Sequence, residues 1–386
     1  MSRTLAAILG GVAGAVALVG IVIILLWFCH LHNKRNSDTG SSDPSVQVGR
    51  NIGVELSLAG GESVPPDSRE ARRFVIEELS LATRNFSDIN LIGVGKFGEV
   101  YKGLLHNGMI VAIKRRPGAP SHEFFREVRY LSSIQHRNLV NLLGYCQEND
   151  QQMLIYEYIP NGSVSSHLYG AGQDPHEKLE FKHRLSIALG AAKGLAHLHA
   201  LSPRLVHKDF KTANVLVDEN FIAKVADAGL VNFLDGVYDA SPSSRMTADD
   251  IFLAPEVREF RRFSEKSDVY GFGVFLLELI SGREAMELLT SESDRNIVEW
   301  AQNYQDSSDI SSIVDHRLGI SFTGEGMKEF VQLTVRCVDL SSERRPTMSY
   351  VVADLDRILE KEMSLTSMGE GTSTVALGSH LFKSLR

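Results

Sequence analysis

The chain has 386 residues and a formal net charge of −8, so it has room for one large domain with added segments and lacks the basic footprint of a nucleic-acid-binding protein. We therefore expect no nucleic-acid partner. The three cysteines, Cys29, Cys146 and Cys337, are far apart in the sequence and form neither a metal-site pattern nor a disulfide framework, which predicts a cytosolic setting for most of the chain.

The first predicted element is a transmembrane helix over residues 4–29. This range contains no charged residue, and about 20 helical residues are enough to span the hydrocarbon core of a bilayer. A cleaved signal peptide is the alternative, but its apolar region is shorter, about 7–15 residues, and ends at small residues. Here the segment ends in Trp27-Phe28-Cys29, which favours an uncleaved anchor. Ala6, Gly10 and Gly14 have the spacing of helix-dimer interfaces, although small residues are common in single spans too.

Residues 30–73 are rich in Ser, Asp, Gly and Pro and show no sustained periodicity, which predicts a mobile juxtamembrane linker. The Ser- and Thr-rich end of the chain, 361–386, is predicted to be a solvated tail. Between them, residues 74–360 are expected to form one domain.

That domain begins with a glycine-rich pattern, Gly93-Val94-Gly95-Lys96-Phe97-Gly98, which dinucleotide-binding folds and phosphate-binding hairpins share. A dinucleotide fold would need a helix after the glycines. Instead, two apolar runs flank Asn107-Gly108, a hairpin signal. The glycines are therefore predicted to join two strands, where the backbone can close over phosphates and Val100 can cover an adenine ring.

Lys114 follows the second of these runs, and its ammonium is expected to meet the α- and β-phosphates of a nucleotide. The next segment places Phe124, Glu127, Val128 and Leu131 at helical spacing, so that Glu127 lies on the apolar stripe. A glutamate there needs a partner, and we predict an ion pair with Lys114. The alternative is a surface glutamate at the edge of the stripe.

The segment 205–216 places an aspartate and an asparagine five residues apart, in the spacing of a phosphoryl-transfer loop. Asp209 is predicted to orient the substrate hydroxyl, and Lys211 to stabilise charge on the transferred phosphate. Asn214 and Asp227 are the predicted ligands of a magnesium ion. Lysine at position 211 is typical of serine/threonine rather than tyrosine specificity.

Together with Ala254-Pro255-Glu256, these motifs give the sequence from about 78 to 359 a resemblance to the plant receptor-like kinases, relatives of the interleukin-receptor-associated kinases. The resemblance implies an α+β, two-lobed protein kinase fold with a small β-rich N-lobe and a larger helical C-lobe. It implies that the domain binds ATP together with Mg²⁺ or Mn²⁺, and that Tyr156 is the gatekeeper residue of the ATP site. It also implies that Asp268 steadies the catalytic loop and that Glu256 forms an ion pair with Arg345. It further implies a nucleotide site built from Gly93, Val94, Gly95, Lys96, Phe97, Gly98, Val100, Ala112, Lys114, Glu157, Tyr158 and Leu216.

Three positions depart from the family pattern. Ala228 stands where the family has a phenylalanine that packs beneath the glutamate-bearing helix, so we expect a looser active arrangement. Lys208 stands where the family has an arginine, so the charge is kept but the bidentate guanidinium group is absent. Residues 248–252 replace a Gly-Thr-x-Gly-Tyr pattern, and Asp249 in this segment is expected to bring negative charge towards Asp209.

The expected function is that of a membrane-anchored serine/threonine kinase that phosphorylates proteins in signalling. Low basal turnover of this kinase is compatible with the expectation. The alternative is a nucleotide-binding pseudokinase that regulates a partner receptor kinase. Because ATP is cytosolic, we expect a single-pass protein, in the plasma membrane, with its kinase domain in the cytosol and no ectodomain. The positive-inside preference from Lys34 and Arg35 agrees but is mild, since Arg3 precedes the span.

Overall fold

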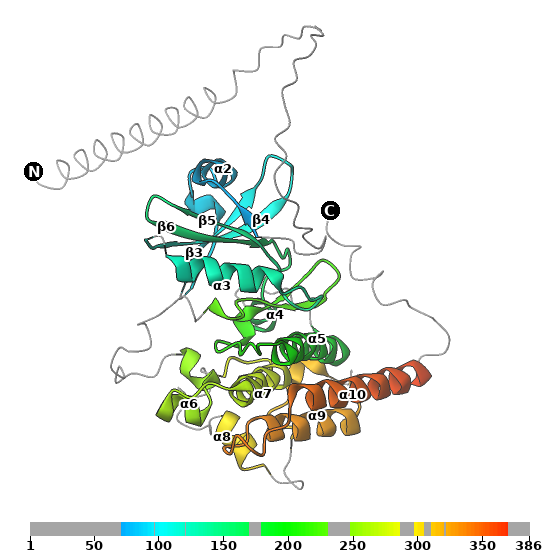
Figure 1. Ribbon diagram of the computed structural model, residues 1–386. Coiled ribbons are helices and arrows are strands. Elements are labelled where there is room, and N and C mark those ends of the chain that lie inside the picture. Colours follow the sequence, from blue (N-terminus) through cyan, green and yellow to red (C-terminus); the bar gives the residue numbers. More distant parts are fainter. Residues whose placement is uncertain are drawn as a thin grey trace, which may run out of the picture. The chain divides into compact units, whose positions relative to one another are not determined.

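The computed structural model describes residues 71–95, 97–119, 121–169, 179–230, 248–285, 297–304, 310–319 and 322–369 (Figure 1). The predicted transmembrane span, nearly all of the predicted linker, and Lys96 lie outside these ranges. Within them, no helix has the length and apolar character needed to cross a membrane.

The N-terminal lobe is built on a six-stranded sheet with the strand order β1-β5-β6-β4-β3-β2. Its strands are β1 (Arg72–Arg73), β2 (Leu91–Gly95), β3 (Gly98–Leu104), β4 (Ile110–Pro117), β5 (Leu142–Glu148) and β6 (Gln151–Glu157). All neighbours pair antiparallel except β1, which runs parallel to β5. The lobe also contains α2 (Ile76–Ala82), the 3-10 turn η1 (Asp88–Asn90) and α3 (His122–Ser133).

The β3–β4 hairpin confirms the turn that Asn107-Gly108 predicts. Gly108 has a φ of +82°, a left-handed conformation that glycine adopts without steric cost. The Asn107 side chain accepts a hydrogen bond from the Met109 N–H at 3.0 Å, which stabilises the turn. The glycine-rich segment therefore connects strands, as predicted, and does not open a helix.

The C-terminal lobe is mainly helical. Its helices are α4 (Val164–Tyr169), α5 (Phe181–Ala200), α6 (Pro255–Phe260), α7 (Glu265–Ser281), α8 (Ile297–Gln302), α9 (Gly324–Cys337) and α10 (Met348–Gly369). Between α5 and α6 lie η2 (Thr212–Asn214), β7 (Val215–Val217), β8 (Ala223–Val225) and η4 (Ala248–Phe252), and η6 (His316–Leu318) precedes α9. Strands β7 and β8 form a separate two-stranded sheet.

Helix α7 is the central element of this lobe. Every residue from Ser267 to Ser281 is buried, because the sequence there is apolar on all sides and other elements surround it. A capping box between Ser264 and Ser267 satisfies its N-terminus, and Gly282, at a φ of +64°, ends it. This rigid helix supports the catalytic loop.

The folded domain extends beyond the predicted bounds at both ends. Strand β1 pairs with β5, so ordered structure begins before residue 74. At the other end, α10 continues to Gly369, which corrects the prediction of a solvated tail from residue 361. The physical reason is Glu362, only 1% exposed, whose carboxylate accepts hydrogen bonds from the backbone and hydroxyl of Thr323 at 2.7 and 2.5 Å.

Candidate active site

The predicted adenine-binding residues lie on one face of the N-lobe sheet. Val100 pairs directly with Lys114, and Ala112 pairs with Tyr156, so these four side chains share a face. Val100 and Ala112 are half-buried, as expected for the roof of an open cleft. Leu216, also half-buried, lies on β7 of the other lobe.

Tyr156 closes the inner end of this face. It is buried, and that burial raises the pKa of its hydroxyl well above the usual value, with the Asp227 charge adding to the effect. Beyond it, the Glu157 N–H donates to the Asn141 carbonyl at 3.1 Å and is not available to a nucleotide. Tyr158 lies with its ring 4.6 Å from the Lys102 ammonium.

The three glycines of the loop are required for different structural reasons. A side chain at Gly93 or Gly95 would meet nothing within 4 Å, so space for a phosphate exists on that side of the backbone. At Gly98 a Cβ atom would lie 2.2 Å from the Arg115 carbonyl oxygen, and its φ is +136°. Gly98 is therefore required by the β3–β4 pairing itself. Phe97 is buried, whereas Val94 is 75% exposed.

The Lys114 ammonium contacts the Asp227 carboxylate. This corrects the prediction that Lys114 pairs with Glu127, for which the described residues show no ion pair. Phe124, Val128 and Leu131 occupy the buried face of α3, as predicted, while Glu127 lies half-buried at its edge. Asp227 is therefore the carboxylate that neutralises Lys114 in this structure.

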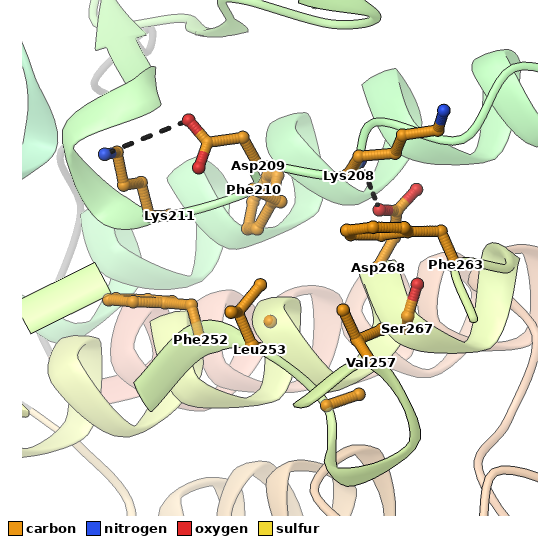
Figure 2. Close-up of a pocket in the computed structure, with 12 residues that line it drawn as sticks. Lys208, Asp209, Phe210, Lys211, Phe252, Leu253, Val257, Phe263, Ser267 and Asp268 are labelled. Carbon is orange, nitrogen blue, oxygen red and sulfur yellow. Dashed lines mark hydrogen bonds and ion pairs between the residues drawn. The ribbon is translucent and has the colours of Figure 1, made fainter. Parts of the chain in front are cut away.

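The catalytic loop brings Asp209, Lys211 and Asn214 together. The Lys211 ammonium lies 3.9 Å from the Asp209 carboxylate (Figure 2). Asn214, on η2, donates its amide N–H to the Asp209 backbone carbonyl at 2.9 Å and to the Asp209 carboxylate at 3.4 Å. Asp209 is half-buried, so a substrate hydroxyl can reach it.

Asp268 on α7 holds this loop from below, as predicted. Its carboxylate accepts hydrogen bonds from the backbone N–H groups of His207 and Lys208 at 2.8 and 3.0 Å, and from the His199 ring at 2.8 Å. Lys208 is thereby held at a φ of +69°, which is strained for a residue with a side chain. The loop conformation is thus imposed by a buried acid on the central helix.

Asn214 and Asp227 supply the donor atoms that magnesium prefers. Because the Asn214 amide nitrogen donates to Asp209, its oxygen is the atom that can face a cation. Magnesium is commonly held by one or two carboxylates, waters and the phosphates of a nucleotide, so a dense protein cage is not needed. Accordingly, no cluster of three His, Cys, Asp or Glu side chains suited to a metal occurs in the described ranges. The residues present fit a magnesium–nucleotide complex.

The Glu256–Arg345 ion pair predicted from the sequence is present. The Arg345 guanidinium is fully buried and makes a bidentate contact with the Glu256 carboxylate at 2.7 and 2.9 Å. Burial alone would raise the pKa of Glu256, but the Arg345 hydrogen bonds outweigh it and lower that pKa. This pair ties α6 to the loop before α10.

This geometry agrees with the comparisons with known proteins. A family model described as protein tyrosine and serine/threonine kinase matches residues 87–355. The proline-rich receptor-like protein kinase PERK3 of Arabidopsis thaliana is 36% identical over 371 residues, which cover 94% of this chain and 67% of the relative. The chain belongs to the protein kinase family, in its plant receptor-like branch.

Two further relatives support this assignment. PERK1 of Arabidopsis thaliana is 40% identical over 77% of the chain, and the nodulation receptor kinase of Pisum sativum is 36% identical over 91%. The chain spans only 46% and 38% of their lengths. A solved structure, the pseudokinase domain of BIR2, an immune regulator of the RLK/Pelle family, matches with a TM-score of 0.62 and 30% identity, over 76% of this chain and 90% of that one.

The small side chain of Ala228 borders a cavity in the kinase domain. A cavity of about 30 Å³ lies beside Ala228 and Asp227, and its lining includes Tyr156, Leu131 at the end of α3 and Ile134 directly after that helix. This volume has room for about two water molecules. The kinase domain therefore has a gap next to Ala228. The looser active arrangement expected from the missing phenylalanine stays a prediction.

The structure describes only part of the activation segment, the stretch between Asp227 and Glu256. Residues 231–247 lie outside the described ranges, as do the side chains of Ala248 and Asp249, so the expected approach of Asp249 to Asp209 stays a prediction. The backbone of 248–252 forms η4, and Ile251 is buried.

Below the catalytic loop, a hollow of about 20 Å³ lies between Asp209 and the segment that leads into α6. Figure 2 shows Phe252, Leu253 and Val257 on the lower side of this hollow and Phe263 at its far end. The hollow could not be predicted from local sequence patterns, because its walls come from separate segments of the chain.

A second group that sequence reasoning missed supports the loop from inside. Glu278, on α7, is fully buried and accepts hydrogen bonds from the Thr212 hydroxyl, from the Tyr169 hydroxyl at 3.2 Å and from the Ala285 N–H at 2.7 Å. Burial raises the pKa of Glu278 to about 7. The available signal was a lone acid within the otherwise apolar run of α7.

Proposed function

We propose that this chain is a membrane-anchored serine/threonine protein kinase that transfers the γ-phosphate of ATP to protein hydroxyls. The observation that carries the proposal is the presence of Asp209, Lys211, Asn214, Asp227 and Lys114 within one site. Phosphoryl transfer depends mainly on positioning and charge neutralisation, and these side chains supply both.

Each residue has a distinct role in this proposal. Asp209 orients the attacking hydroxyl and accepts its proton, and Lys211, 3.9 Å away, neutralises charge that builds up on the phosphate. Asn214 and Asp227 would hold a magnesium ion, which would supply positive charge to neutralise the phosphates. Lys114, which contacts Asp227 in this structure, would contact the α- and β-phosphates of a bound nucleotide and leave the Asp227 carboxylate available to a metal ion.

A pseudokinase that binds nucleotide and regulates a partner membrane receptor kinase is the second candidate. Two observations favour it: the cavity beside Ala228 and the Lys114–Asp227 contact, which occupies both partners. The similarity to a pseudokinase domain that belongs to an immune regulator is consistent with this reading.

The location is part of the proposal. Residues 4–29 have the length and apolar character of a single span, and their Ala6, Gly10 and Gly14 spacing supports pairing of two chains within the bilayer. We place the kinase domain on the cytosolic side of the plasma membrane, where ATP is available.

Transfer of labelled phosphate from ATP to a protein acceptor tests the proposal. The full chain in detergent is compared with Asp209→Asn and with Asp356→Asn, which removes an equal charge from an exposed position on α10. We expect Asp209→Asn to lose at least about a hundredfold in rate, the lower range for a general base, while Asp356→Asn retains full activity. Equal incorporation by all three proteins would exclude the active-kinase proposal.

A further inference from the structure

The catalytic loop is attached to α7 at two points, and an acidic side chain of α7 makes each attachment. At the first point, Asp268 accepts hydrogen bonds from the backbone N–H groups of His207 and Lys208 (Figure 2). At the second point, Glu278 accepts a hydrogen bond from the hydroxyl of Thr212. Positions 268 and 278 are ten residues apart, which corresponds to about 15 Å along a helix. The two acids therefore hold the two ends of the loop separately.

The second attachment is shielded from water. Glu278 is 0% exposed and Thr212 is 1% exposed, so solvent does not compete for their hydrogen bond. The carboxylate oxygen that accepts from Thr212 also accepts from the Tyr169 hydroxyl at 3.2 Å. A hydrogen bond to a charged acceptor is stronger than one between neutral groups, and a low local dielectric strengthens it further. The contact therefore fixes the Thr212 side chain and the backbone turn that carries it.

That turn also carries a predicted magnesium ligand. Thr212 is the first residue of η2 and Asn214 is the last, and the Asn214 N–H donates to the Lys211 carbonyl at 2.9 Å. The Asn214 amide donates to the Asp209 carbonyl at 2.9 Å, and the Lys211 ammonium lies 3.9 Å from the Asp209 carboxylate. Because η2 is a single turn, a shift of Thr212 displaces the groups on both sides of it.

Glu278 has a third donor, which by itself would suggest a structural role. Its other carboxylate oxygen accepts a hydrogen bond from the Ala285 N–H at 2.7 Å and so stabilises the turn after α7. That contact needs only one acceptor atom, whereas burying a whole acidic group is costly. Two hydroxyl donors and one N–H donor converge on Glu278, and an ionised carboxylate is a group that only accepts. The hydroxyl contacts therefore explain why an acid stands here.

We propose that Glu278 is a positioning residue of the phosphoryl-transfer site. Through the Thr212 hydroxyl it fixes η2, and thereby the Asn214 amide that would hold a magnesium ion and the Lys211 ammonium beside Asp209. Glu278 touches neither the nucleotide nor the substrate hydroxyl, so it acts through the loop alone. The inference rests on the proposed kinase function, because it assigns a role in that reaction.

Three single variants of the full chain separate positioning from stability. Thr212→Val removes the hydroxyl and keeps the shape of the side chain, while Thr212→Ser keeps the hydroxyl. Thr334→Val is the matched control, because Thr334 is also fully buried and donates its hydroxyl to the Phe330 carbonyl at 2.8 Å within α9. It makes the same chemical change outside the catalytic loop.

The first measurement is the magnesium concentration that gives half of the rise in melting temperature at a fixed ATP concentration. We expect Thr212→Val to raise this concentration about tenfold, the factor that corresponds to losing one hydrogen bond to a charged group. Thr212→Ser and Thr334→Val should keep the wild-type value. A merely structural role would lower the melting temperature of both valine variants and leave the magnesium requirement unchanged.

The second measurement is steady-state phosphate transfer from ATP to a protein acceptor at saturating magnesium. Because Lys211 and Asn214 are displaced relative to Asp209, Thr212→Val should lower kcat about tenfold and leave KM for the acceptor unchanged. Thr212→Ser should restore most of the loss, and Thr334→Val should retain the wild-type kcat.

Glu278→Gln tests whether the effect passes through this pair of residues. Alone, it should raise the magnesium requirement, because it weakens the same contact from the other side. In the Thr212→Val background it should add nothing, since the contact is already lost. An equal effect of Glu278→Gln in both backgrounds would overturn the proposal. If Thr212→Val does not fold, the magnesium requirement of Glu278→Gln alone decides the test.

The proposed kinase function and this inference fail in different ways. A wild type that binds ATP with magnesium but transfers no phosphate excludes the kinase function, and the magnesium requirement of Thr212→Val still decides the role of Glu278. If the wild type transfers phosphate and folded Thr212→Val matches it in kcat and magnesium requirement, the kinase function stands and the inference is wrong. An equal rise in the magnesium requirement of Thr334→Val would also overturn the inference.

Discussion

The substitution Ala228→Phe tests how the missing phenylalanine affects the kinase. A ring at this position would enter the cavity of about 30 Å³ beside Leu131 of α3 and Ile134, which follows that helix. Filling a void gains about 24 cal/mol per Å³, so this cavity corresponds to about 0.7 kcal/mol. If that energy favours the placement of α3 in which Glu127 reaches Lys114, the population of the active arrangement rises about threefold.

The assay is steady-state phosphate transfer at saturating ATP, together with thermal unfolding of each variant. We expect Ala228→Phe to raise turnover about threefold and the melting temperature by about 1–2 °C. A ring exceeds the present void, and overpacking costs about 1–3 kcal/mol when neighbours cannot move. Ala228→Leu, which demands less space, therefore serves as the companion variant and should show a smaller gain in turnover.

Glu127→Gln is the control that tests whether the gain in turnover of Ala228→Phe depends on the position of α3. In that background position 127 can no longer supply a carboxylate to Lys114 when α3 shifts, so Ala228→Phe should raise stability but not turnover. Either of two results would exclude this role of the cavity. One is unchanged turnover in both Ala228→Phe and Ala228→Leu when these proteins are folded, and the other is a turnover gain that persists in Glu127→Gln.

Three other predictions concern stability and location. Glu256→Gln should lower the free energy of unfolding by about 3 kcal/mol in urea titrations, because it leaves the buried Arg345 without its anion. A loss below about 1 kcal/mol, which is typical of a surface ion pair, would contradict this prediction. Because burial raises the pKa of Glu278 to about 7 from 4.5, the folded state holds a proton there that the unfolded state has released, and stability should fall as pH rises from about 5 to above 7. Glu278→Gln should flatten that slope, and an unchanged slope would assign it to other groups. Deleting residues 4–29 should release the chain from sedimented membranes into the supernatant, whereas sedimentation unaffected by the deletion would exclude this segment as the anchor.

Local sequence signals predicted the parts of the site that depend on neighbouring residues. The Asn107-Gly108 turn, the buried face of α3 and the spacing of Asp209 and Asn214 all appear as expected, because each depends on backbone geometry over a few residues. The Asp268 and Glu256 contacts were also predicted, through resemblance to a family in which those positions have defined partners.

Long-range packing explains what the sequence did not predict. The choice of Lys114 between Glu127 and Asp227 depends on where α3 lies against the sheet, and no periodicity encodes that placement. Likewise, the polar sequence at the end of α10 predicts a solvated tail. In the structure, however, the Glu362 carboxylate accepts a hydrogen bond from the hydroxyl of Thr323, which is 39 residues away in the sequence. The hollow below the catalytic loop arises only when that loop and α6 are brought together.

The proposed kinase differs from a pseudokinase in that its site transfers phosphate and does not only bind nucleotide. A magnesium titration of the full chain with ATP separates the two, when melting temperature and the formation of phosphoserine or phosphothreonine are followed on the same samples. We expect the melting temperature and the amount of phosphoamino acid both to rise with magnesium. EDTA should reverse the rise in melting temperature and stop the formation of phosphoamino acid. A melting temperature that rises while no phosphoamino acid forms would contradict the kinase proposal and identify the chain as a pseudokinase.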